Sequence, residues 1–274
     1  MLRCIATCVG FLVLLAGCTL VDPTRAAHEN LQRLAAAAGF VRHDLPGGKF
    51  PLAVLTRGTP AAGQPLIVFL EGDGQPWISR WQPARDPSPL DPLAFRLAAA
   101  TPGPVAYLPR PCQFVSSADA AQACHVELWT SQRYGEEIVA AMDHALDSLT
   151  AGSDGLILIG YSGGGTIAAL VAARRHDIRR LITVAAPLDI TAWCRGHGLP
   201  PLSGSLSPRD ELHRLVGTEQ IHFVGSDDTV VSPAANLRFF EHLHPSAIRL
   251  IPEFDHDCCW VNAWPELFRS IGSR

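Results

Sequence analysis

One stretch of the sequence decides the fold: residues 156–173 read LILIGYSGGGTIAALVAA. An apolar strand predicted over 156–160 runs into the pattern Gly-x-Ser-x-Gly, and a helix predicted over 164–175 follows. A serine in such a sharp turn exposes its hydroxyl, and the glycines leave room for the neighbouring strand and helix. The helix also directs backbone N–H groups at the same place. Ser162 is therefore predicted to be a nucleophile; the alternative is a tight structural turn whose serine is incidental.

Apolar runs alternate with helical patterns along most of the chain. Residues 75–92 and 187–215 are rich in turn-forming residues and are predicted to be loops. Strands are predicted at 40–42, 52–55, 65–70, 105–108, 181–185, 221–225 and 248–251, and helices at 26–38, 92–100, 132–149, 233–243 and 262–271. Continuous apolar strands between helices predict the α/β class, with a mostly parallel sheet covered on both faces.

The N-terminus has the features of an export signal. Arg3 precedes an apolar run over 4–16 that is short for a membrane span, and the sequence then reads Leu-Ala-Gly-Cys up to Cys18. These four residues resemble the bacterial lipobox. The resemblance implies a signal peptide over 1–17, lipid on Cys18, and a single mature domain over 18–274 anchored to a membrane of the bacterial cell envelope, at its periplasmic face or in the outer membrane. An uncleaved membrane anchor is the alternative.

Composition excludes several classes of function. Of 274 residues, 47% are hydrophobic and 18% are charged, which is enough apolar material for a large core. The formal net charge is −4 and the basic residues are scattered, so no nucleic-acid partner is expected. There is no dinucleotide fingerprint, no zinc motif and no phosphate-binding loop with its Lys, so no cofactor is predicted. A metal site of His256 with Cys258 and Cys259 is disfavoured because it lacks a C-x-x-C spacing.

Five cysteines follow residue 18: Cys112, Cys124, Cys194, Cys258 and Cys259. Export makes disulfides plausible, and an odd number leaves at least one thiol unpaired within the chain. Cys112 and Cys124 bracket a short polar loop and are predicted to form a disulfide. Cys258 and Cys259 are adjacent and are expected to be poorly placed to bond each other, so that one of them is a candidate partner for Cys194.

Three more segments accompany the serine turn. Residues 71–74 read EGDG after the strand at 65–70, residues 225–233 read GSDDTVVSP after another strand, and residues 255–257 read DHD after the last strand. Serine, acid and histidine therefore occur in that order. With these pieces the whole mature chain resembles the α/β-hydrolase fold family. The resemblance implies a serine hydrolase, of esterase or lipase type, with a catalytic triad.

The resemblance assigns roles to particular residues. Ser162 is the nucleophile, and His256 is the general base, with a surface histidine paired to a neighbouring carboxylate as the alternative. Asp228 has the offset expected of the acid that orients the histidine. Asp227 stays open as the acid, and one of the two carboxylates is expected only to accept backbone N–H bonds in the turn. Asp189, which follows the strand at 181–185, is a weaker candidate.

The oxyanion hole is expected to use two backbone N–H groups, those of Gly163 and Asp73, with Gly72 or Gly74 as alternatives to Asp73. Many family members have His-Gly where this chain has Glu71-Gly72. Two acidic side chains facing the cleft would disfavour anionic substrates. The alternative is that both carboxylates form hydrogen bonds within the loop.

The implied reaction is hydrolysis of a carboxylic ester or related acyl bond in a small-molecule acyl substrate, through an acyl-serine intermediate. The same triad can cleave thioesters or amides and can transfer acyl groups, and the fold does not choose among them. The alternative from another class is a non-catalytic envelope lipoprotein that uses the same shell for binding.

Overall fold

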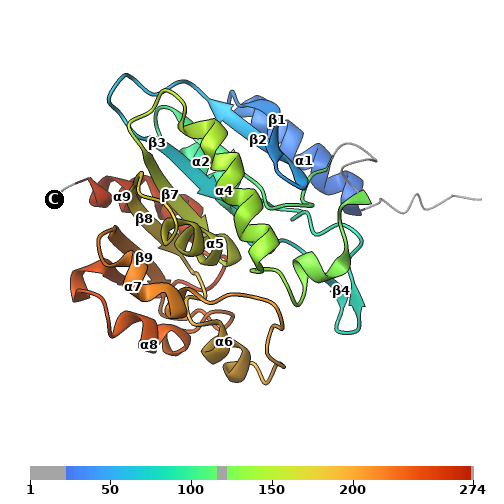
Figure 1. Cartoon of the computed structure of the whole chain (residues 1–274), viewed down its shortest axis with the longest axis vertical. Coiled ribbons are helices and arrows are strands. Elements are labelled where there is room, and N and C mark those ends of the chain that lie inside the picture. The colour runs from blue at the N-terminus through green and yellow to red at the C-terminus, as the bar shows by residue number, and fades with distance from the viewer. Residues whose placement is uncertain (1–22, 116–121, 273–274) are drawn as a thin grey trace, which may run out of the picture.

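The computed structural model describes residues 23–115 and 122–272. Its centre is an eight-stranded sheet in the order β1–β2–β6–β3–β7–β8–β9–β10 (Figure 1). β2 is antiparallel to both of its neighbours, and the pairs from β6 to β10 are all parallel. The strands are β1 Val41–Gly47, β2 Phe50–Arg57, β3 Leu66–Leu70, β6 Val105–Leu108, β7 Leu156–Tyr161, β8 Ile178–Val184, β9 Glu219–Gly225 and β10 Ile248–Ile251.

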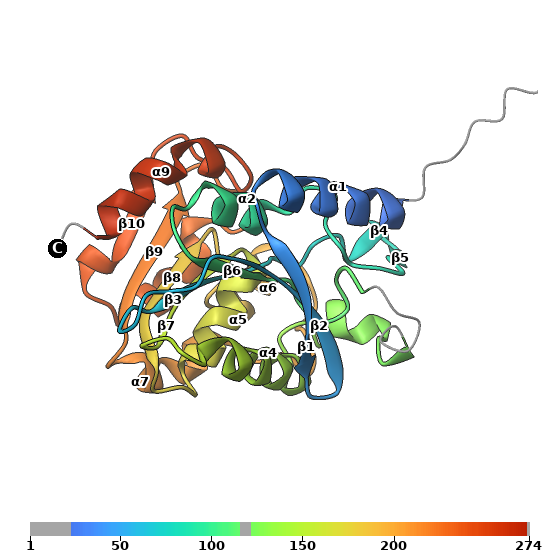
Figure 2. The same ribbon diagram turned by 90° about the horizontal axis from the view of Figure 1, so that it is seen from above.

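Helices cover both faces of this sheet (Figure 2). One face carries α1 (Pro23–Ala37), α2 (Leu93–Ala100) and α9 (Trp260–Ile271), and the other carries α4 (Glu136–Thr150) and α5 (Gly163–Ala172). The predicted α/β architecture with a mostly parallel sheet is confirmed. Shorter helices connect these elements: α6 Ile190–Gly196, α7 Leu212–Leu215, α8 Leu237–Phe240, and the 3₁₀ turns η1 Val126–Trp129, η2 Pro208–Glu211, η3 Pro233–Asn236 and η4 Pro245–Ala247.

The alternation of side chains along the strands builds two cores. On β3, Val68 and Leu70 enter the core shared with α4 and α5, whereas Phe69 enters the core shared with α1, α2 and α9. This follows from the two-residue period of a strand. Trp264 of α9 packs edge-to-face on Phe69, with 5.8 Å between ring centres. Because both faces are buried, the central strands are apolar throughout, which is why the sequence made them easy to find.

The structure differs from the expected loops in two places. The segment 75–92 contains a small hairpin of β4 (Trp77–Ser79) and β5 (Gln82–Pro83). The segment 187–215 contains α6, η2 and α7. The Asp189 carboxylate accepts a hydrogen bond from the backbone N–H of Ala192 and so caps α6. These elements are too short to show a clear hydrophobic period, and the helix predicted over 233–243 is likewise broken into η3 and α8.

Within the two described ranges, no helix is both long enough and apolar enough to cross a membrane. The predicted signal peptide and the predicted lipidation site, Cys18, lie outside the described residues.

Candidate active site

Ser162 lies at the sharp turn between β7 and α5 and has φ 50° and ψ −126°. Positive φ is uncommon for a residue with a side chain, and such strain is held in place by the surrounding structure. The Ser162 N–H donates to the carbonyl of Val184 over 2.8 Å. A Cβ atom on Gly160 would overlap the carbonyl of Gly164, and one on Gly164 would overlap the carbonyl of Leu70. The glycines are therefore required by close backbone approach, as the sequence predicted.

His256 connects Ser162 to Asp228. The distance from His256 Nε2 to Ser162 Oγ is 3.0 Å, and the distance from His256 Nδ1 to Asp228 Oδ2 is 2.9 Å. The Asp228 side chain is fully buried and the His256 side chain is 13% exposed. The other Asp228 oxygen, Oδ1, accepts the backbone N–H groups of Val230 and Val231 over 2.8 and 2.7 Å. One carboxylate thus shapes its own turn and contacts the histidine.

The other acid candidates are engaged elsewhere. Asp227 is exposed, and its Oδ1 accepts a hydrogen bond from Ser226 Oγ over 2.7 Å. Asp189 is buried at the N-terminus of α6, where its carboxylate accepts the N–H of Ala192 over 2.9 Å. We expected the turn and the histidine to use different carboxylates, and that is wrong. The two oxygens of Asp228 serve both partners, which a sequence offset cannot reveal.

The histidine loop is fixed by two residues that the sequence analysis missed. Tyr161 donates its hydroxyl to Asp257 Oδ1 over 2.9 Å, lies 3.2 Å from the carbonyl of His256, and has its ring centre 5.4 Å from the imidazole. Trp260 donates its indole N–H to the same carbonyl over 2.9 Å. Burial and the Asp257 carboxylate raise the pKa of Tyr161, so its hydroxyl keeps the proton that it donates. Tyr161 occupies a variable position of the Gly-x-Ser-x-Gly pattern, so no motif identifies it.

Tyr161→Phe is expected to lower kcat roughly three- to tenfold, the range of one lost hydrogen bond, with KM for a short ester unchanged. The ring remains, so packing against His256 is kept. The measurement is steady-state ester hydrolysis together with thermal unfolding. Thr101→Val is the matched control, because it removes a buried hydroxyl that bonds to Trp264 Nε1 and to the carbonyl of Leu97 and does not line the cavity that contains Ser162. Equal losses of kcat in the two variants would contradict a positioning role for Tyr161.

The two residues expected to supply the oxyanion donors are in contact. A Cβ atom on Gly163 would overlap the Asp73 carboxylate, so the loop after β3 packs directly on the start of α5. In the part of the chain that the structure describes, the N–H groups of Gly163 and Asp73 make no hydrogen bond to the protein. The Gly72 N–H instead donates to Glu71 Oε1 over 2.9 Å. This arrangement favours Asp73 over Gly72 as the second donor.

A buried ionic network holds the Asp73 side chain. Arg110 contacts one carboxylate oxygen, and Arg133 Nη1 and the Tyr134 hydroxyl contact the other over 2.8 and 2.9 Å. Burial alone would raise the pKa of Asp73, but the guanidinium groups of Arg133 and Arg110 outweigh it and lower the pKa. The charge of Asp73 is therefore neutralised inside the protein, and its backbone is held beside α5.

Glu71 is also turned inward. It is 2% exposed, and its carboxyl accepts hydrogen bonds from the Gly72 N–H and from the Tyr107 hydroxyl, the latter over 2.9 Å. Burial raises the pKa of Glu71. Both acidic side chains form internal contacts, but apart from the Gly72 N–H their partners lie outside the loop, so neither expected arrangement describes them fully. The charge of the Asp73 carboxylate is compensated by Arg110 and Arg133, and the Glu71 carboxyl is buried among hydrogen-bond donors.

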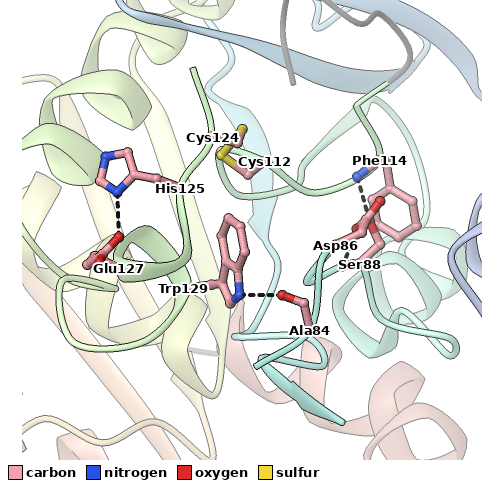
Figure 3. Close-up of a disulfide and its surroundings, with 9 residues drawn as sticks. All are labelled: Ala84, Asp86, Ser88, Cys112, Phe114, Cys124, His125, Glu127 and Trp129. Carbon is pink, nitrogen blue, oxygen red and sulfur yellow. Dashed lines mark hydrogen bonds and ion pairs between the residues drawn. A yellow bond between two sulfur atoms is a disulfide. The ribbon is translucent and has the colours of Figure 1, made fainter. Parts of the chain in front are cut away.

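The predicted Cys112–Cys124 disulfide is present (Figure 3). It lies next to residues that support the oxyanion loop. Gln113 donates its side-chain N–H to the Gly72 carbonyl over 3.0 Å and accepts the Arg110 N–H over 3.0 Å. The disulfide therefore fixes the segment that holds both the carbonyl of Gly72 and, through Arg110, the carboxylate of Asp73.

The other cysteine expectation is wrong. Cys258 and Cys259 are bonded to each other across a cis peptide bond, with 3.1 Å between their Cα atoms, and Cys194 is a buried free thiol. The two adjacent cysteines are therefore not too poorly placed to bond each other, and neither of them pairs with Cys194. Across 23–115 and 122–272, no cluster of three or more His, Cys, Asp or Glu side chains is arranged to hold a metal ion.

A cavity of about 550 Å³ opens over Ser162. Its walls combine the residues above with apolar side chains, among them Pro76, Pro89, Leu93, Trp193, Val230 and Val231. A larger cavity, of about 760 Å³, lies around α7, the start of β9 and η4, and neither Ser162 nor His256 lines it. The smaller cavity is the candidate substrate site, because it contains the serine and histidine.

No protein-family model matches the sequence, and no curated protein matches it either. Solved structures do resemble it. A bacterial membrane phospholipase A has a TM-score of 0.55 at 14% identity, over 92% of this chain and 93% of that one. A serine hydrolase without a lid from Xanthomonas campestris has a TM-score of 0.52 at 18% identity, over 86% of this chain and 96% of that one.

An esterase of Pyrococcus furiosus has a TM-score of 0.59 at 12% identity, over 86% of this chain and 92% of the esterase. These identities are low, so the likeness is one of fold. The chain has the α/β-hydrolase fold, and the structural neighbours named here are a serine hydrolase, an esterase and a phospholipase.

Proposed function

We propose that this protein is a serine hydrolase that cleaves carboxylic esters or related acyl bonds. The observation that carries the proposal is the continuous hydrogen-bonded chain from Asp228 through His256 to Ser162 at a cavity wall. A serine hydroxyl becomes nucleophilic only when a base takes its proton, and the base works only when it is oriented. The fold of the structural neighbours supports the same reading.

In the proposed mechanism, Ser162 Oγ attacks the acyl carbon while His256 Nε2 takes the hydroxyl proton. The Asp228 carboxylate holds Nδ1–H and stabilises the imidazolium that forms. The backbone N–H groups of Gly163 and Asp73 donate to the oxyanion of the tetrahedral intermediate. His256 then gives its proton to the leaving alcohol, which leaves an acyl-serine. Water, activated by the same histidine, releases the acid and restores the Ser162 hydroxyl.

A fluorophosphonate probe tests this function. The probe is expected to form one covalent adduct, at Ser162, which peptide mass spectrometry locates. Ser153→Ala is a matched control, because its hydroxyl bonds to the carbonyl of Thr150 away from the cavity, and it should label normally. A series of p-nitrophenyl esters of increasing chain length then gives the acyl preference. Absence of labelling and of ester turnover in the intact protein would support the non-catalytic binding shell instead.

We also propose that the mature protein is the domain over 18–274, held at the bacterial cell envelope by lipid on Cys18. The lipobox-like sequence is the support for this proposal. Cys18→Ser is expected to leave unprocessed precursor, because the modified cysteine defines the cleavage site. Immunoblotting of membrane and soluble fractions checks the result. Cleavage at the same bond, with unchanged membrane partition, would rule out the lipoprotein.

A further inference from the structure

Several large apolar side chains are exposed together on one small element. On the β4–β5 hairpin, Trp77 is 41% exposed, Ile78 is 56% exposed and Trp81 is 81% exposed, and Leu90 nearby is 46% exposed. Burial of apolar side chains stabilises a protein, so a chain that leaves several of them in water forgoes that stabilisation. Exposed apolar side chains that gather on one projecting element are typical of a contact site.

The hairpin is not a loose loop that could fold its side chains back onto the body. At its base, the Ala84 N–H donates to the carbonyl of Pro76, and the Gln75 N–H donates to the carbonyl of Pro87, both over 2.9 Å. The buried Trp129 donates its indole N–H to the Ala84 carbonyl over 3.1 Å (Figure 3). These bonds fix the base, so the apolar tip is held outward (Figure 1).

The hairpin starts at the rim of the substrate cavity. Pro76, which immediately precedes Trp77, lines the cavity over Ser162, and so does Pro89 on the returning segment. A surface that seats the hairpin would therefore lie beside the opening through which a substrate reaches Ser162.

The segment that follows β5 is joined to α1. His28 Nε2 lies 3.2 Å from Asp86 Oδ2, and the Asn30 side chain donates to the carbonyl of Leu90 over 2.8 Å. The N-terminal end of α1 and the hairpin lie on the same side of the molecule in both views (Figures 1 and 2). Cys18 precedes the start of α1 at Pro23 by five residues, a reach of at most about 18 Å. A lipid anchor on Cys18 would hold this side toward a bilayer.

The charges of the hairpin fit a lipid surface. The guanidinium of Arg80 lies 4.8 Å from the centre of the Trp81 ring, Arg85 is exposed, and no acidic residue occurs from Gly74 to Arg85. Tryptophan is enriched at the interface between hydrocarbon and headgroups, and exposed arginines there attract anionic phospholipids.

We infer that the β4–β5 hairpin is a membrane-contact element that seats its tryptophans among lipid headgroups and turns the Ser162 cavity toward acyl esters held in the bilayer. The substrate class in this inference rests on the proposed function, whereas the membrane contact does not. A soluble ester needs no such contact, so the hairpin affects only substrates that the membrane presents.

The full chain is reconstituted in vesicles of phosphatidylcholine and phosphatidylglycerol whose acyl chains are brominated, and its tryptophan fluorescence is measured. We expect bromine to quench the wild type, and a Trp77→Ser/Ile78→Ser/Trp81→Ser variant to lose that quenching. The control is Val216→Ser/Leu250→Ser, which removes side chains that are 83% and 57% exposed elsewhere, and it should quench like the wild type. This readout requires no catalysis.

Turnover is then compared for a phospholipid in vesicles and for a dissolved p-nitrophenyl butyrate. The triple variant is expected to turn over the vesicle substrate about tenfold or more slowly than the wild type and to keep wild-type turnover of the dissolved ester. The control variant is expected to keep wild-type turnover of both substrates. Unquenched wild-type fluorescence would overturn the membrane contact, even with esterase activity intact. Quenching without turnover of any ester would instead overturn the proposed function alone. A wild-type dimer in solution that the triple variant converts to monomer would reassign the hairpin to self-association.

Discussion

Ser162→Ala should lower ester turnover by roughly three to six powers of ten and change thermal stability little. The hydroxyl is the atom that forms the acyl-enzyme, so its loss leaves only substrate binding and the two oxyanion donors. Alanine has the same backbone requirements as serine at φ 50°, and the Ser162 N–H still reaches the carbonyl of Val184. The turn should therefore survive the substitution. The measurement is kcat/KM on the best p-nitrophenyl ester, with unfolding followed by circular dichroism.

The labelling experiment supplies the control for this kinetic result. A Ser162→Ala protein that no longer reacts with fluorophosphonate but unfolds at the wild-type temperature has lost chemistry and not structure. Near-wild-type ester turnover in Ser162→Ala would mean that the mechanism proposed here is falsified, whatever the fold.

Asp228→Asn should cost about four powers of ten in kcat, while Asp227→Asn stays within a few-fold of the wild type. An amide nitrogen facing His256 Nδ1 cannot accept its proton, and the imidazole then takes the wrong tautomer for accepting a proton from Ser162. The amide oxygen can still accept the N–H groups of Val230 and Val231, so the turn is kept. Steady-state kinetics at matched folded fraction measures the difference.

Asp227 is a strict control for that result. It is the adjacent residue of the same type in the same turn, but it is exposed and bonded to Ser226. A larger loss in Asp227→Asn than in Asp228→Asn would transfer the orienting role to Asp227. If neither substitution lowered turnover, no carboxylate of this turn would be needed to orient His256.

The central strands could be predicted from local apolar patterns, whereas the convergence of Ser162, Asp228 and His256 was implied by the resemblance to the α/β-hydrolase family. The strands are apolar through their whole length. Ser162, Asp228 and His256 each follow the carboxyl end of a parallel strand, and these ends lie on the same side of the sheet. Their hydrogen-bond distances of 2.9 and 3.0 Å agree with that expectation. No comparable local pattern marks the residues that support them.

The supports are long-range contacts. Asp73 meets Arg110 and Arg133, which are 37 and 60 positions away, and Tyr161 meets Asp257 across 96 positions. A single sequence carries no signal for such pairs, because any of its arginines could fill the role. The hairpin after Asp73 was missed for a different reason: its strands have three and two residues, too few to show alternation.

The Cys112–Cys124 disulfide makes the activity of the proposed enzyme depend on the oxidation of two cysteines. The disulfide restrains the segment of Gln113, whose side chain donates to the carbonyl of Gly72 in the loop that carries one of the two oxyanion donors. On the proposed mechanism, we expect a chain whose Cys112 and Cys124 are reduced to hold this loop less firmly and to turn over esters more slowly than the oxidised chain. On the proposed export route, the same bond would delay the attack on acyl esters until the cysteines are oxidised.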